Sequence, residues 1–302
     1  MNKITKIWLI IAAALVALGL VIFAGVMTAY DYDFTKLSTV TYEAKTHEIG
    51  DAFDKIAIYV NTTEIKLAPS ADEMCRIECF ETNKVKYSAT VTDGTLIIDT
   101  VDTRKWYDYI GIFLGKQTMT VYLPQDNYVS LSINTNTGDV EIPKDFTFGE
   151  IGIDGDTADV QCLASISKNI EIELSTGSIN MSELTAENID FSTTTGDINI
   201  NNVNVNGNVE TETDTGNITL NNVVAKGDFE IESSTGNVKF EKSDAAQIFV
   251  KTSTGNVTGN LLSEKIFITE TSTGNVSVPK TASGGKCEIT TSTGNIEIHT
   301  AP

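Results

Sequence analysis

The residues best suited to chemistry in this chain are carboxylates that recur in pairs. Glu210 and Glu212 lie one repeat unit before Glu230 and Glu232. Acids that face one another across neighbouring strands could serve a glycoside hydrolase or bind a cation. Such ladders also arise on any strongly acidic repeat, where solvation alone accounts for them. A carbohydrate-active enzyme is therefore a disfavoured alternative.

Other catalytic signatures are weak. The sequence has two histidines, His47 near the start and His299 near the end, so no histidine-based dyad or metal site is evident. It has no Gly-x-Ser-x-Gly motif, no phosphate-binding loop and no His-Glu-x-x-His motif. We therefore expect a protein that is not an enzyme, with no catalytic residue, no cofactor and no metal.

The four cysteines look structural. Two of them lie four residues apart in an expected strand, on one face but roughly 13 Å from each other, which is beyond the reach of a disulfide. The other two fall at core positions of distant repeat units. We expect all four to be small buried side chains rather than disulfides or metal ligands. They are Cys75, Cys79, Cys162 and Cys287.

One segment is rich in aromatic residues. Residues 104–116 carry Trp106, Tyr107, Tyr109 and Phe113, with basic residues at both ends. Aromatic residues flanked by charge are typical of protein interfaces and of contacts at the membrane surface. The segment could also fold over one end of the domain as a cap. We predict these four side chains as partner contacts.

The charge limits the class of partner. The formal net charge is −20, from 41 acidic and 21 basic residues. So acidic a surface repels phosphate backbones, which excludes nucleic acid as a partner.

The elements that position these residues are predicted by an internal repeat. A Thr-Gly-Asn/Asp/Ser tripeptide recurs every 19 or 20 residues, and Thr157-Ala158-Asp159 fills the one gap in the series. Glycine can adopt the positive φ that a sharp corner needs, so we place these glycines at structural corners. They are Gly138, Gly177, Gly196, Gly216, Gly236, Gly255, Gly274 and Gly294.

Apolar and polar residues alternate on both sides of each corner. Ile189 and Phe191 precede Gly196, for example, and Ile198 and Ile200 follow it. Strict alternation predicts strands with one buried face. One such unit cannot bury its apolar face alone, so successive units should stack. The predicted fold is an all-β solenoid, a single-chain β-helix of 19–20-residue rungs.

The region before the regular repeat is a blurred version of it. Residues 56–67 centre on Thr63 and residues 87–98 on Gly94, with apolar residues at the offsets of the regular copies. Both predict early rungs, and residues 72–86 predict an inserted strand or hairpin. Residues 119–124 read as another strand, ended by proline.

The N-terminus predicts one transmembrane helix. Lys3 and Lys6 precede an apolar run from Ile7 to Ala29, and these 23 residues would form a helix of about 34 Å, enough to cross a bilayer core. The basic residues at the start predict a cytoplasmic N-terminus and an extracytoplasmic remainder. A cleaved signal peptide is the alternative.

The resulting division of the chain has five parts. They are a cytoplasmic N-terminus (1–6), a transmembrane signal anchor (7–29), a stalk or cap (30–50), irregular first rungs and a cap with the aromatic insertion (51–130), and regular rungs (131–302).

The chain resembles a known family at several points. The matching segments are Phe53-Asp-Lys-Ile-Ala-Ile, Thr90-Val-Thr-Asp-Gly-Thr-Leu-Ile-Ile, Val121-Tyr-Leu-Pro and the Thr-Gly-Asp/Asn repeats. With the N-terminal anchor, they resemble the putative-adhesin family of bacterial envelope proteins of unknown function, including its LiaG-like members. The resemblance covers most of residues 50–302. It implies the fold and no catalytic residues, and some relatives are associated with envelope-stress signalling.

We therefore expect a non-enzymatic bacterial cell-surface protein, held in the membrane by its helix, with a binding, adhesion or structural role for a rigid extracytoplasmic solenoid. Its expected partner is another membrane protein or a cell-wall polymer. The alternative within this class is a regulatory ectodomain that contacts an envelope-stress membrane sensor.

Overall fold

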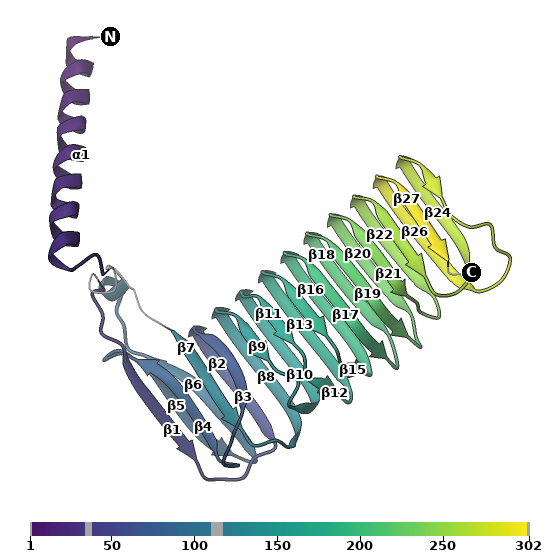
Figure 1. Cartoon of the computed structure of the whole chain (residues 1–302), viewed down its shortest axis with the longest axis horizontal. Helices are drawn as coiled ribbons and strands as arrows, with labels where there is room; N and C mark the ends of the chain where they lie inside the picture. The colour runs from purple at the N-terminus through teal and green to yellow at the C-terminus, as the bar shows by residue number, and fades with distance from the viewer. Residues whose placement is uncertain (1, 34–37, 110–116, 301–302) are drawn as a thin grey trace.

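Residues 2–33, 38–109 and 117–300 are described by the computed structural model, and in them the chain forms one α-helix, one short 3-10 helix and two long β-sheets (Figure 1). Helix α1 (Lys3–Ala29) stands apart from the sheets at one end of the molecule, which we call the anchor end. It is long and apolar enough to cross a membrane, as a membrane anchor or a signal sequence would be.

The two sheets form a β-solenoid, as the repeat predicts. Sheet A has 14 strands and sheet B has 13, and each regular rung gives one strand to each sheet. Neighbouring rungs pair in parallel, and Ile198 aligns with Ile218 on one side and Ile179 on the other. The regular rungs are β8 (Asn127–Thr137) with β9 (Val140–Ile142), β10 (Thr147–Thr157) with β11 (Val160–Cys162), β13 (Asn169–Thr176) with β14 (Ile179–Ser182), β16 (Asn188–Thr195) with β17 (Ile198–Val205), β18 (Val209–Thr215) with β19 (Ile218–Ala225), β20 (Phe229–Thr235) with β21 (Val238–Ser243), and β22 (Ile248–Thr254) with β23 (Val257–Leu261).

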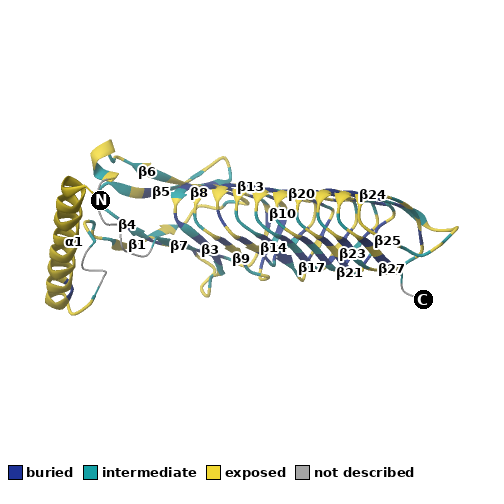
Figure 2. Cartoon of the chain, turned by 90° about the horizontal axis from the view of Figure 1, so that it is seen from above, coloured by how far each residue is buried: buried dark blue, intermediate teal, exposed yellow. Residues whose placement is uncertain are grey.

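The core lies between the two sheets. Figure 2 shows the buried residues as a continuous band along the inside of the solenoid. Phe191, Ile198 and Ile200 are fully buried, whereas the residues that alternate with them face solvent. Two short strands, β12 (Ser165–Ile166) and β15 (Thr185–Ala186), pair with β10 and β17 beside the main ladders.

The corner glycines are required because successive rungs approach closely. A Cβ on Gly236 would lie 1.7 Å from the carbonyl oxygen of Gly216, and one on Gly177 would lie 1.8 Å from that of Ala158. The predicted positive φ is found at five of the eight corners, with values from 138 to 159. Gly196 does not have a positive φ, yet a Cβ on it would still lie 1.9 Å from the carbonyl oxygen of Gly177. Space between rungs is therefore the constraint common to the corners.

Side chains at the corners also connect the rungs. The buried hydroxyl of Thr213 donates to the Gly196 carbonyl oxygen at 3.1 Å, in the rung before its own. The backbone N–H of Asn237 donates to the side-chain oxygen of Asn217 at 3.0 Å, and that of Asn256 donates to Asn237 at 2.9 Å. Thr213, two residues before the motif of its rung, and the asparagines of the motif thus bind the backbone of adjacent rungs.

The early rungs are partly as predicted. The copy centred on Thr63 forms a rung, with β2 (Lys55–Thr62) beside β8 and β3 (Glu64–Pro69) beside β9. The copy centred on Gly94 is not a rung, and this prediction is wrong. Strands β5 (Val85–Thr92) and β6 (Thr95–Asp102) form an antiparallel hairpin within sheet B. Asp93 and Gly94 both have positive φ (50 and 72), which suits a tight two-residue hairpin turn.

The stacking order departs from the order of the sequence at both ends. At the anchor end, the rung β2–β3 lies between β8–β9 and an outer rung made of β6 and β7 (Thr118–Leu123). At the other end, the last rung of the chain, β26 (Gly285–Thr293) with β27 (Ile296–Thr300), lies beneath the earlier β24 (Lys265–Thr273) and β25 (Val276–Ser277). The expectation that successive units simply stack is wrong for these rungs. Insertion gives each inserted strand a neighbour on both edges.

Two antiparallel strands complete sheet A at the anchor end. β4 (Cys75–Glu81), within the segment predicted as an inserted strand or hairpin, pairs with β7. β1 (Glu43–Ile49) pairs with β4 and forms the edge of the sheet.

The corner geometry predicts a specific sensitivity to a single methyl group. Gly236→Ala should lower stability by at least about 2 kcal/mol, because its Cβ meets a carbonyl oxygen that cannot move without separating two rungs. Gly152→Ala is the matched control, since a Cβ there meets no atom within 4 Å, and its effect should stay within about 0.5 kcal/mol. Thermal melting followed by circular dichroism measures both. Equal melting temperatures for the two variants would contradict the corner assignment.

Candidate functional site

The aromatic segment leaves the solenoid at the anchor end. After β6 ends at Asp102, the chain turns outward into the 3-10 helix η2 (Trp106–Tyr109). We call residues 102–109 the aromatic turn. Figures 1 and 2 both show it at the same end of the solenoid as α1.

The aromatic side chains of this turn face solvent. Trp106 is 77% exposed, Tyr109 55% and Tyr107 49%, and no residue of η2 is buried. Phe113, the fourth predicted contact residue, lies outside the described residues. Trp106, Tyr107 and Tyr109 therefore do not fold over the end of the solenoid as a cap, which was the alternative expectation.

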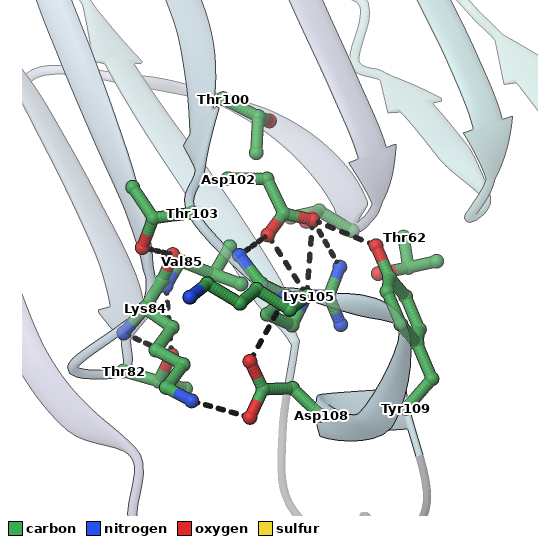
Figure 3. Close-up of polar contacts among 12 residues, drawn as sticks. Thr62, Thr82, Lys84, Val85, Thr100, Asp102, Thr103, Lys105, Asp108 and Tyr109 are labelled. Atoms are coloured by element: carbon green, nitrogen blue, oxygen red, sulfur yellow. Dashed lines mark hydrogen bonds and ion pairs between the residues drawn. The ribbon is translucent and has the colours of Figure 1, made fainter.

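An ion pair between Asp102 and Arg104, which we call the fork, holds the base of the turn in place (Figure 3). Arg104 donates from Nε and Nη2 to Asp102 at 2.9 and 2.6 Å, and the Arg104 backbone N–H donates to the same carboxylate at 2.8 Å. These hydrogen bonds hold the pKa of the Asp102 carboxyl below its usual value. The guanidinium of Arg104 also lies over the ring of Tyr109, 4.6 Å from its centre.

A second ion pair ties the turn to the β4–β5 connection (Figure 3). The Lys105 backbone N–H donates to Asp108 at 2.8 Å, and the Lys84 ammonium pairs with the same carboxylate. Both interactions lower the pKa of Asp108. Lys84 also lies 5.9 Å from the centre of the Tyr107 ring. Cations thus lie beside the rings of Tyr107 and Tyr109, and two carboxylates hold the backbone of the turn that carries Trp106.

A cavity of about 280 Å³ opens beside the turn. Its wall includes Tyr107 and Asp108 of the turn, together with Tyr42, Phe80 and Tyr87 from the end of the solenoid. A cavity edged by aromatic rings and by charged groups could accept an apolar side chain with a polar neighbour.

The paired carboxylates meet as the repeat suggested. Glu210 aligns with Glu230, and Glu212 with Glu232, on the outer face of sheet B. Burial and the neighbouring carboxylates, Asp190 first among them, raise the pKa of Glu210. The row of Glu212 and Glu232 ends at Lys251, which aligns with Glu232 in the next rung and forms an ion pair with it at 3.0 Å.

The cysteines are unpaired and buried, as expected. Burial raises the pKa of each thiol to about 12, which makes it a poor nucleophile. The expectation for His47 is incomplete, since the structure places it 3.1 Å from Glu81 and close to Cys79. Sequence reasoning missed this group because the antiparallel pairing of β1 with β4 cannot be inferred from the repeat.

Most of this chain matches the model of a known protein family. The family described as Toastrack DUF4097 matches residues 53–212 and 205–301. The chain belongs to the Toastrack family. The match begins at Phe53, just before β2, and runs to the end of β27. The search of curated proteins found no match.

Solved structures similar to this Toastrack chain include three described as putative adhesins. The one from Bacteroides fragilis is 15% identical, with 85% of this chain and 97% of that chain covered and a TM-score of 0.47. Those from Parabacteroides distasonis and Parabacteroides merdae are each 14% identical, each with 86% of this chain covered. The match covers 98% of the Parabacteroides distasonis chain, with a TM-score of 0.46, and 97% of the Parabacteroides merdae chain, with a TM-score of 0.48.

The fork predicts how the turn can be loosened without unfolding the Toastrack domain. Asp102→Asn should cost about 1 kcal/mol, because the pair is partly exposed, and should free the turn. In a Trp8→Phe background Trp106 is the one remaining tryptophan, so its fluorescence anisotropy reports the motion and should fall. Asp99→Asn, an exposed position on the same strand, is the control. An anisotropy equal in both variants would mean that the fork does not order the turn.

Proposed function

We propose that this Toastrack protein is a non-enzymatic, membrane-anchored binding protein whose aromatic turn contacts another membrane protein. The observation that carries the proposal is the exposure of Trp106, at 77%, on a turn that is ordered from below. An exposed tryptophan and two tyrosines are costly to leave in water, and aromatic residues are enriched at protein interfaces. Pre-ordering also reduces the entropy lost on binding.

The position of the turn supports a partner in the same membrane. Helix α1 leaves the domain at the anchor end, where the turn lies. With Lys3 and Lys6 before the apolar run, the N-terminus is cytoplasmic and the solenoid extracytoplasmic. The turn then faces the outer surface of the membrane, within reach of the exposed part of a neighbouring membrane protein. A sensor of envelope stress is one such protein.

If the partner were a cell-wall polymer, binding would occur elsewhere on the molecule. It would use the outer faces of the solenoid, where ladders such as Glu210 beside Glu230 repeat along the axis. A net charge of −20 disfavours acidic polymers on those faces. We therefore favour the turn over the faces.

Capture from solubilised membranes tests the proposal. The full chain in detergent should enrich one membrane protein, and a variant with Trp106→Ser, Tyr107→Ser and Tyr109→Ser should enrich it at least about tenfold less, as expected for loss of interface hot spots. Tyr59→Ser is the matched control, because it removes an aromatic side chain that is 46% exposed on another part of the surface.

Melting curves should first show that all forms are folded. Equal capture of the membrane protein by the triple variant would overturn the proposal. Capture of cell-wall polymer by all three forms would instead assign binding to the solenoid faces.

A further inference from the structure

Three side chains with metal-ligating atoms meet at the edge of sheet A. They are His47 on β1 and Cys79 and Glu81 on β4, and their ligand atoms all lie within 4.8 Å of one another. A nitrogen, a sulfur and a carboxylate oxygen are the three donor types that zinc takes in proteins. The aromatic turn does not include this group, and the proposed function does not use it.

The strand pairing explains why the three meet. In the antiparallel register of β1 and β4, His47 lies opposite Ile77, so its ring stands on the inward face of the sheet, as do Cys79 and Glu81 two and four residues along β4. His47 Nε2 lies 3.1 Å from Glu81 Oε1. In a tetrahedral zinc site, neighbouring ligand atoms lie roughly 3.5 Å apart. Rotation of these side chains would bring the ligand atoms to that separation when the ion binds.

The carboxylate has an oxygen to spare. Oε1 of Glu81 accepts hydrogen bonds from the Tyr87 backbone N–H, at 3.1 Å, and from His47. Among the described residues no hydrogen bond reaches Oε2 of this carboxylate, whose side chain is only 9% exposed. The Tyr87 bond fixes the carboxylate in place, as outer contacts do in metal sites.

The site has a route to solvent. The His47 side chain is 29% exposed, because β1 is the edge strand of sheet A. Three protein ligands and an open side fit a divalent ion that keeps one water molecule.

We propose that His47, Cys79 and Glu81 form a binding site for a divalent transition-metal ion of the zinc class. Binding forms bonds from the metal to His47 Nε2, Cys79 Sγ and a Glu81 carboxylate oxygen. The Cys79 thiol loses its proton to solvent as the sulfur–metal bond forms. Because binding releases this proton, binding should weaken as the pH falls. The bound ion joins the edge strand β1, which follows the anchor, to β4.

Cobalt(II) is the probe, because a thiolate bound to it gives a charge-transfer band in the near ultraviolet. The full chain in detergent, reduced and purified without a histidine tag, should show this band at one equivalent of cobalt, and zinc should abolish it. Zinc should also raise the melting temperature, because a ligand that binds the folded form stabilises it.

Matched variants locate the site. Cys79→Ala should abolish the band, and His47→Ala should weaken cobalt binding at least about tenfold, since even outer contacts contribute that much. Cys75→Ala should change neither, although it removes a buried thiol from the same strand and the same face. His47 is partly exposed at an edge, so its variant remains informative if Cys79→Ala does not fold.

Three results would overturn the proposal. The first is the absence of any charge-transfer band in the native chain. The second is a band that persists in Cys79→Ala, and the third is an unchanged cobalt affinity in His47→Ala; either of these would place the cobalt elsewhere.

Discussion

Every rung of this protein depends on the rung beside it. The backbone hydrogen bonds of a strand such as β18 run to β16 and β20, and the corner glycines allow these rungs to approach within contact of a carbonyl oxygen. A stack of this kind is stable in its middle and incomplete at its ends, where one row of backbone groups has no neighbour. How the ends are closed therefore determines what surface the protein offers to a partner.

Both ends are closed in the same way. The rung that comes first or last in the domain sequence is not the outermost one, because another rung lies over it. At the far end the last rung of the chain lies under β24–β25, and at the anchor end the first rung lies under β6–β7. The anchor end needs more chain to do this. The outer rung is reached through the β5–β6 hairpin, and the connection from β6 to β7 carries the aromatic turn. The candidate site is thus part of the connection that closes the stack.

The regular rungs could be predicted because one pattern specifies both the strands and their contacts. A period of two gives the buried face, and a spacing of 19 or 20 residues aligns residues such as Ile198 and Ile218. The pattern around Gly94 has the same period, yet its second strand pairs antiparallel to the first. Alternation does not specify which strand becomes the neighbour, so the hairpin, the inserted rungs and the pairing of β1 with β4 could not be inferred. The aromatic residues of the turn were found from composition alone, but the group of His47, Cys79 and Glu81 needs that pairing.

The position of the candidate site depends most directly on how the anchor end is closed. In the structure Tyr59 of β2 aligns with Asn134 of β8 on one side and with Asp99 of β6 on the other. Neighbouring strands lie about 4.8 Å apart, within disulfide reach, whereas strands two apart are about 10 Å from each other. The measurement is disulfide formation under mild oxidation in two double variants. Tyr59→Cys with Asn134→Cys should form the bond and Asp99→Cys with Asn134→Cys should not. Bond formation in the second variant but not in the first would mean that the rungs stack in the order of the sequence, and would contradict this description of how the site is built.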